Sequence, residues 1–366
     1  MAAGVEKTDR KAGWIALSVF LALVAVLSLW GLRGVSSSLR RLHLAPFHRE
    51  GVVIPLGPEG SGYSGRILEP TVVREGADFY AWYSGLPYNG GGLDEHWNVY
   101  YSWSRDGKVF TPGSLALAGA WEQSVVKSGA IYYMAYVRAN GFNVRLATSE
   151  DRLHWVDRGE IVNANAAWTK TGPGFGPREP DLFKDPVSGD WFVYFGAAAA
   201  DGKYKIGMAR CPAGKNPALP GDWIVQATPF FSPDTSHGRW NDGGDTESPC
   251  VEYYPRLKRG GVYLLSFIGY RPLPAVNKSW RIGLAAASSP EGPFTEICFN
   301  PICEGGRPGA FDENIVGEVS HLEYKGVFYL YYSGGKKNGA NQIGLLTIPS
   351  LDMAEWIEQP YALRSK

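Results

Sequence analysis

The sequence predicts an all-β fold, a five-bladed β-propeller preceded by one N-terminal transmembrane helix. One pattern, a glutamate followed by a β-rich stretch, a turn and an aromatic-rich stretch, recurs five times along the 366 residues. The 46 glycines and 25 prolines suit many tight turns, and a 13% aromatic content suits pleated, half-buried surfaces. An uncharged apolar run near the N-terminus, residues 14–32, is long enough to cross a bilayer.

The N-terminal run is predicted to anchor the chain in a membrane. Lysines and arginines flank it on both sides, so we expect residues 1–33 to form a cytosolic stub and a transmembrane signal anchor. Residues 34–48 would then be a linker, and residues 49–366 the propeller. A cleaved signal peptide is the alternative, although the sequence that begins at Arg33 is a poor cleavage site. Because the basic residues are balanced, they do not fix the orientation of the anchor.

The repeat divides the soluble part into blades. Its first strands begin with the glutamates, and its second strands are aromatic, as in DFYAWYSG at 78–85. A third strand follows, as in NVYYSWS from Asn98, and a fourth precedes the next glutamate, as in GEIV from Gly159. Radial repetition of such units is typical of a propeller, whereas a sandwich needs no five equivalent units and a β-helix repeats at a shorter period. The five glutamates are Glu69, Glu122, Glu179, Glu247 and Glu318.

The stretch GVVIPL at 51–56 has the character of a fourth strand but precedes the first glutamate. We expect it to complete the last blade, so that the two ends of the domain meet and no sheet edge stays open.

Composition limits the partners. The formal net charge is zero and only 20% of residues are charged, so no basic surplus exists to neutralise phosphates and nucleic-acid binding is not expected. Cys298 and Cys303 are close enough in sequence for a small-loop disulfide in an oxidising compartment, and buried or free thiols are an equal alternative.

The five glutamates are predicted to line one mouth of the central channel. The first strand of each blade runs along that channel and side chains alternate, so glutamates in one register should face it together, and Asp181 should share that face. Converging carboxylates repel unless some stay protonated, pair with arginine or lysine, or bind a cation. Alternatively, each glutamate hydrogen-bonds backbone amides of the neighbouring blade. That alternative stays open above all for Glu122 and Glu318.

Four stretches resemble the five-bladed propeller glycosidases, the superfamily of glycoside hydrolase families 43 and 32. They are REPDLFKDPVSGDWFVYFGA (178–197), TESPCVEYYP (246–255), EPTVVREGADFYAWYSG (69–85) and RLATSEDRLHW (145–155). The resemblance spans about residues 67–359. It implies that Glu69 is the base or nucleophile, that Glu247 is the proton donor and that Glu179 supports them. The acids that precede proline are usually aspartate in those families, whereas here both are glutamate, which moves each carboxylate by about a bond length.

The resemblance implies a glycoside hydrolase that cleaves a furanose- or xylose-type glycan by carboxylate acid–base catalysis. Its partner would be an oligo- or polysaccharide, met outside the cytoplasm, so we expect an extracytoplasmic propeller, secreted if the N-terminal segment is cleaved. No organic cofactor is required, and a Ca²⁺ ion could bind in the central channel at Glu318; other metal ligands stay unassigned. The candidates for substrate binding are Arg178, Asp181, Trp82, Glu122, Glu318, His237 and Trp240.

One of these candidates has a plainer interpretation, and the function has an alternative. Trp82 falls on a middle strand, where packing in the core is the favoured interpretation for an aromatic residue. The alternative function is a non-catalytic glycan-binding or scaffold propeller, whose glutamate ring is structural or holds a cation.

Overall fold

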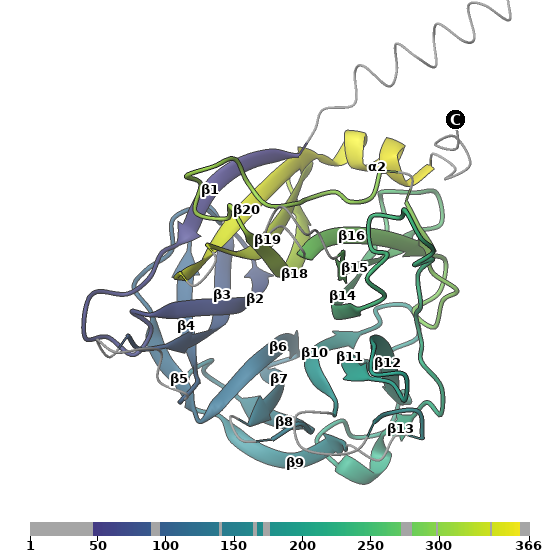
Figure 1. Ribbon diagram of the computed structural model, residues 1–366. Coiled ribbons are helices and arrows are strands. Elements are labelled where there is room, and N and C mark those ends of the chain that lie inside the picture. The colour runs from purple at the N-terminus through teal and green to yellow at the C-terminus, as the bar shows by residue number, and fades with distance from the viewer. Residues whose placement is uncertain are drawn as a thin grey trace, which may run out of the picture. The chain divides into compact units, whose positions relative to one another are not determined.

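Strands β1–β20 pair into five four-stranded antiparallel sheets, which are arranged radially as blades in Figure 1. The computed structural model describes residues 47–88, 96–138, 141–163, 167–170, 176–271, 280–297, 299–336 and 339–358. The predicted five-bladed propeller is therefore confirmed. The predicted membrane helix at 14–32 lies outside the described residues, and none of the helices within them has the length and apolar character to span a membrane.

In blades one to four the strands follow one another from the inside outwards in chain order, whereas the outermost strand of blade five is β1. Blade one comprises β2 (Arg66–Glu75), β3 (Asp78–Leu86), β4 (Asn98–Ser104) and β5 (Ser114–Ala118), and blade two comprises β6 (Ala120–Ser128), β7 (Ile131–Arg138), β8 (Val144–Ser149) and β9 (Val156–Val162). Blade three comprises β10 (Arg178–Lys184), β11 (Trp191–Ala198), β12 (Tyr204–Cys211) and β13 (Ile224–Val225), and blade four comprises β14 (Thr246–Tyr254), β15 (Val262–Tyr270), β16 (Trp280–Ala287) and β17 (Thr295–Glu296). Blade five comprises β18 (Ile315–Tyr324), β19 (Val327–Gly335), β20 (Asn341–Pro349) and β1 (His48–Ile54).

Blade five closes the ring with strands from both ends of the domain. Strand β1 pairs antiparallel with β20, from His48 opposite Thr347 to Ile54 opposite Ile343. This pairing confirms that the stretch around 51–56 completes the last blade. Arg49 on β1 pairs with Asp312, which also accepts a 2.7 Å hydrogen bond from the Tyr332 hydroxyl of β19. A short helix, α2 (Ser350–Glu358), follows β20 and buries Met353.

The core consists of aromatic and aliphatic layers between neighbouring blades. Between blades three and four, for example, Phe192 and Tyr194 of β11 pack in one cluster with Leu265 and Phe267 of β15. Strand β11 is buried along its whole length, because both of its faces contact another blade. The aromatic second strands of the repeat therefore hold the blades together.

The cysteine prediction involves one residue that is not described. Cys298 lies outside the described residues, while Cys303 is buried and accepts a hydrogen bond from Arg49 Nη2 at 3.4 Å.

Candidate active site

Every inner strand carries a bulge at its start. The pairing with the second strand shifts between Leu68 and Thr71 in blade one, and equivalent shifts occur in the other four blades. One residue within each bulge has a left-handed backbone, which L-residues rarely adopt and which costs about 1–3 kcal/mol unless the surroundings compensate. These residues are Glu69 (φ 58°), Glu122 (φ 50°), Glu179 (φ 49°), Ser248 (φ 52°) and Glu318 (φ 28°).

Blade four departs from the common register. Ser248 occupies the left-handed position there, and Glu247 precedes it, at the place that Trp121 and Arg178 occupy in blades two and three. The prediction that all five glutamates share one register is therefore wrong for Glu247. For the same reason, the counterpart of Asp181 on the channel wall is Cys250.

Three glutamate carboxylates bond the main chain of the next blade. Glu69 Oε2 accepts the Glu122 N–H at 2.8 Å, Glu122 Oε2 accepts the Glu179 N–H at 2.9 Å, and Glu179 Oε2 accepts the Ser248 N–H at 2.9 Å. We call these the inter-blade bonds. They satisfy backbone N–H groups that the bulges remove from the strand ladder, and so compensate the left-handed conformation.

A hydroxyl group, that of Ser333, replaces the carboxylate where blade five meets blade one. The Glu69 N–H donates to Ser333 Oγ at 2.9 Å, and the Val72 N–H donates to Ser320 Oγ at 3.0 Å. Glu318 does not bond the next blade in this way; its Oε2 is buried and has no hydrogen-bond partner among the described residues. The alternative that the glutamates join neighbouring blades thus describes the contacts of Glu122, but not those of Glu318.

Arg178 neutralises two of the carboxylates. Its Nη2 lies 2.9 Å from Glu122 Oε1 and 3.0 Å from Glu179 Oε1, and its side chain is only 24% exposed. The guanidinium also lies 5.7 Å from the ring centres of both Trp121 and Tyr204. Arg178 therefore lies at the mouth as expected, but its contacts there are with the glutamates.

Burial raises the pKa of four glutamates at the mouth. It raises the pKa of Glu122 to about 7, against the opposing effect of Arg178. Burial, reinforced by Glu122 and Glu318, raises the pKa of Glu69 well above its usual range. Burial and the neighbouring Glu179 do the same to the pKa of Glu247, against the opposing effect of Arg178. Burial raises the pKa of Glu318 to about 7. Carboxyls with a raised pKa thus lie close to the two glutamates that Arg178 contacts.

Of the five glutamates, Glu247 has the fewest polar contacts to its carboxyl within the described residues. It is 6% exposed, and within the described ranges its side chain makes no hydrogen bond. The displacement by one residue in blade four explains this, because Ser248 supplies both the N–H and the hydroxyl that bond Glu179, the latter at 2.8 Å. Glu247 is left as a buried carboxyl with a raised pKa, next to the two glutamates that Arg178 contacts.

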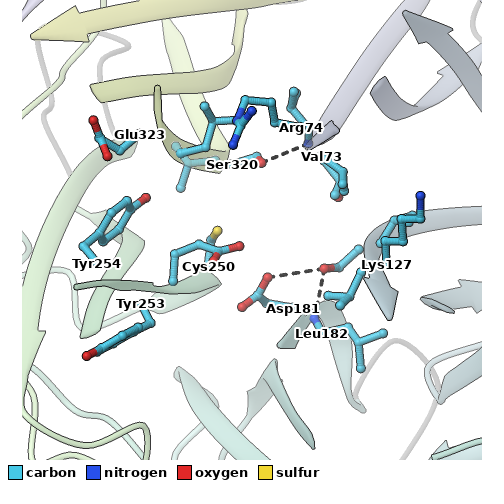
Figure 2. Close-up of a pocket in the computed structure, with 18 of the residues that line it drawn as sticks. Val73, Arg74, Lys127, Asp181, Leu182, Cys250, Tyr253, Tyr254, Ser320 and Glu323 are labelled. Carbon is cyan, nitrogen blue, oxygen red and sulfur yellow. Dashed lines mark hydrogen bonds between the residues drawn. The ribbon is translucent and has the colours of Figure 1, made fainter. Parts of the chain in front are cut away.

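Asp181 lies deeper in the channel than the glutamates. Its Oδ2 accepts the Val251 N–H at 2.7 Å and its Oδ1 accepts the Ser124 hydroxyl at 3.3 Å. It faces a cavity of about 510 Å³ that the inner strands of all five blades line, and Figure 2 shows it there near Cys250. Burial raises the pKa of Asp181 to about 7. Asp181 joins blades two, three and four, and also lines the small space below the glutamates.

Three predicted substrate contacts do not reach the glutamates. Trp82 is fully buried between blades one and two, as the core interpretation has it, and its indole donates to the Arg152 carbonyl at 3.2 Å. Trp240 is buried against Phe267, and its indole donates to Glu296 at 2.9 Å. His237 is fully exposed on its loop, 3.9 Å from Asp242. These contacts do not support a role in substrate binding for the three residues.

Other residues at the mouth were not singled out from the sequence. Ser84 donates to Glu69 Oε2 at 2.5 Å, and Trp121 stacks on Trp97 at 5.5 Å. Ser248 could have been found from spacing, since Glu69 and Glu179 are followed directly by proline whereas Ser248 separates Glu247 from Pro249.

The predicted Ca²⁺ stays a prediction. In the part of the chain that the structure describes, no group of three or more His, Cys, Asp or Glu side chains is arranged to hold a metal ion. Glu318 keeps a buried oxygen without a hydrogen-bond partner, but it supplies only one ligand.

No protein-family model and no curated protein sequence matches this chain. Solved structures match its fold. A structure named as a glycoside hydrolase aligns with a TM-score of 0.62 at 14% identity, over 82% of this chain and 92% of that one. An α-L-arabinofuranosidase from Podospora anserina in complex with cellotriose gives 0.57 at 13% identity, over 83% and 98%. A thermostable family-43 glycoside hydrolase gives 0.56 at 16% identity, over 80% and 90%. The chain therefore has the five-bladed fold of the group that its motifs resemble.

Proposed function

We propose that this chain is a glycoside hydrolase that cleaves a glycan by carboxylate acid–base catalysis at the glutamate mouth of its channel. Glu247 carries the proposal, because it is buried, burial and Glu179 raise its pKa, and no hydrogen bond among the described residues occupies its carboxyl. A carboxyl with a raised pKa beside ionised carboxylates can give its proton to the glycosidic oxygen as the bond breaks. The fold likeness to structures named as glycoside hydrolases supports the same class.

Glu69 is the proposed base or nucleophile, and Glu179 the supporting carboxylate. Glu69 must be ionised to act, and its raised pKa means that this form becomes populated only as the pH rises. Arg178 holds Glu122 and Glu179 in place, so a negative charge persists near the reacting carbon, where the oxocarbenium-like transition state develops positive charge.

The proposed substrate is an oligo- or polysaccharide of furanose or xylose type. Among the matching structures are the arabinofuranosidase from Podospora anserina and an endo-1,4-β-xylanase from Bacteroides thetaiotaomicron. The proposed enzyme works extracytoplasmically on a membrane anchor, in line with the apolar run at 14–32.

A panel of aryl furanosides and pyranosides tests the proposal. Wild type should hydrolyse at least one of them, and Glu247→Gln and Glu69→Gln should each abolish that hydrolysis while the exposed control Glu150→Gln keeps it. For an aryl glycoside with a good leaving group, Glu247→Gln should be less damaging than for a poor one, because the leaving oxygen then needs less protonation. Hydrolysis that neither substitution affects would show that the catalytic residues lie elsewhere.

A second candidate is a non-catalytic glycan-binding or scaffold propeller. The inter-blade bonds favour it, because they show that Glu69, Glu122 and Glu179 already serve the main chain of neighbouring blades. Binding of glycans that survives Glu247→Gln and Glu69→Gln, with no turnover by wild type, would select this candidate.

A further inference from the structure

A second cavity, outside the central channel, is lined by four arginines. It measures about 590 Å³, and its charged lining residues are Arg49, Arg239, Arg271, Arg281 and Glu304. We call it the arginine pocket. The guanidinium group presents several N–H donors in a planar fork that matches a carboxylate, sulfate or phosphate.

Buried carboxylates lie behind three of these arginines. Asp312, 3% exposed, pairs with Arg49, and Glu296, 8% exposed, lies 3.2 Å from Arg239. Asp242, 12% exposed, lies 3.4 Å from Arg271 Nε. Because these partners are more buried than the arginines, they orient the guanidinium groups. Both terminal nitrogens of Arg49 are engaged, since Nη2 also donates to the Glu304 carbonyl and to Cys303 Sγ, whereas Arg271, with a side chain 33% exposed, meets Asp242 through Nε. Such preorganised donors bind an anion at a lower entropic cost.

A carboxylate of the protein already lies at this pocket. Glu304 Oε2 is 3.3 Å from Arg281 Nε, while the Glu304 side chain is 56% exposed. The Arg281 side chain is only 11% exposed, whereas the Glu304 end of the pair faces solvent, so an external anion competes with Glu304 for Arg281. Glu304 thus marks the charge that the pocket accepts.

The arginine pocket and Glu247 lie at the same end of blade four. Across that blade Glu247 pairs with Ile268, Ile268 with Ile282, and Ile282 with Cys303, which lines the pocket. Three steps between neighbouring strands place Cys303 about 14 Å from Glu247 across the blade. Arg271 directly follows β15 and Arg281 lies at the start of β16, so both come from the end of the blade where Glu247 lies.

We propose that the arginine pocket binds an acidic group of a saccharide, a uronate carboxylate or a sulfate, on the same chain as the bond that Glu247 protonates. The substrate class is then an acidic glycan, and this part of the inference rests on the proposed function. The binding of the anion itself does not.

Binding is measured on the full-length chain carrying Glu247→Gln, which prevents turnover. Calorimetric titration with trigalacturonate should give a Kd that Arg271→Gln weakens about tenfold, the loss expected for one charge-assisted contact. Glu304→Gln should tighten binding roughly threefold, because it removes the competing carboxylate. Arg259→Gln, which removes a positive charge at the opposite end of blade four, should change nothing, and neutral xylotriose should bind equally to all variants.

Two results would overturn the proposal. One is trigalacturonate affinity that is the same in Arg271→Gln and Glu304→Gln as in their parent. The other is binding of inorganic sulfate at the pocket without competition from trigalacturonate, which would rule out the saccharide. Opposite responses of an exposed arginine and an exposed glutamate are not produced by misfolding, so the pair keeps the test decisive. A chain that binds trigalacturonate but hydrolyses no glycan contradicts the proposed function and leaves the pocket intact.

Discussion

Glutamate makes different contacts in blade four than in blades one to three. In blades one to three the glutamate occupies the left-handed position of the bulge and accepts an N–H from the next blade. In blade four Ser248 occupies that position, and Glu247 lies one residue earlier with no hydrogen bond to its carboxyl among the described residues.

The difference separates structural from chemical use of a buried carboxyl. A carboxylate that accepts N–H groups and pairs with Arg178, as Glu122 does, is held in one place and stabilises the ring. A carboxyl without such partners contributes little to stability, and it is available to exchange a proton. A single serine, Ser248, is enough to move Glu247 from the first class to the second.

The largest effect should come from replacing Glu247. We expect Glu247→Gln to lower kcat/KM by about 10²–10⁴-fold on a substrate with a poor leaving group, because general acid catalysis is lost. Circular dichroism and the melting temperature should stay close to those of wild type. A small kinetic effect would place Glu247 among the structural glutamates.

Glu122 should show the converse behaviour. Glu122→Ala leaves the Glu179 N–H without its acceptor and removes one partner of Arg178, so the free energy of unfolding should fall by about 3 kcal/mol. Urea denaturation measures it. Glu247→Ala is the matched control and should change stability by less than about 1 kcal/mol. Equal losses in the two variants would contradict the distinction between the blades.

Stability should fall as the pH rises from 5 to 8. The folded-state pKa of Asp181 is raised to about 7 by burial, above the value near 3.9 expected in the unfolded chain. The folded state therefore binds more protons across this window, and the stability present at low pH is lost as the pH approaches 7. The same sign holds for Glu252, whose pKa burial raises to about 8.

Asp181→Asn isolates the contribution of Asp181 to this pH dependence. The difference in melting temperature between pH 5 and pH 8 should shrink, because a neutral amide costs nothing to keep buried as the pH rises. An unchanged difference in Asp181→Asn would assign the pH dependence to other buried acids.

The smallest effect should come from Ser248. Ser248→Ala removes the 2.8 Å hydrogen bond from its hydroxyl to Glu179 but keeps the N–H bond, so we expect a loss of about 1 kcal/mol. Ser248→Gly loses the same bond but relaxes the left-handed backbone at φ 52°, and should cost less than alanine. If glycine costs more than alanine in urea denaturation, the backbone at this position is not strained.

The blades and the closure of the ring could be predicted from the sequence, because each strand has a recognisable pattern of apolar and aromatic residues between turns. The five glutamates, the aromatic second strands and the stretch at 51–56 follow local rules of alternation and turns. The neighbourhood of the site was predicted less well. Trp240 comes from a long loop near Glu247, yet it packs in the core, since its position depends on the hydrophobic packing between blades three and four.

The sequence by itself determined the number of blades, the strand that closes the ring and the gathering of acidic residues at one mouth. The tertiary structure decided which carboxyls are bonded, paired or protonated, and it brought Arg49, Arg239, Arg271 and Arg281 together from distant segments. The physical reason is how far apart in the chain the interacting residues lie. Strand patterning depends on neighbours along the chain, whereas protonation and pairing depend on burial and on charges that only the packed blades bring within a few ångströms of one another.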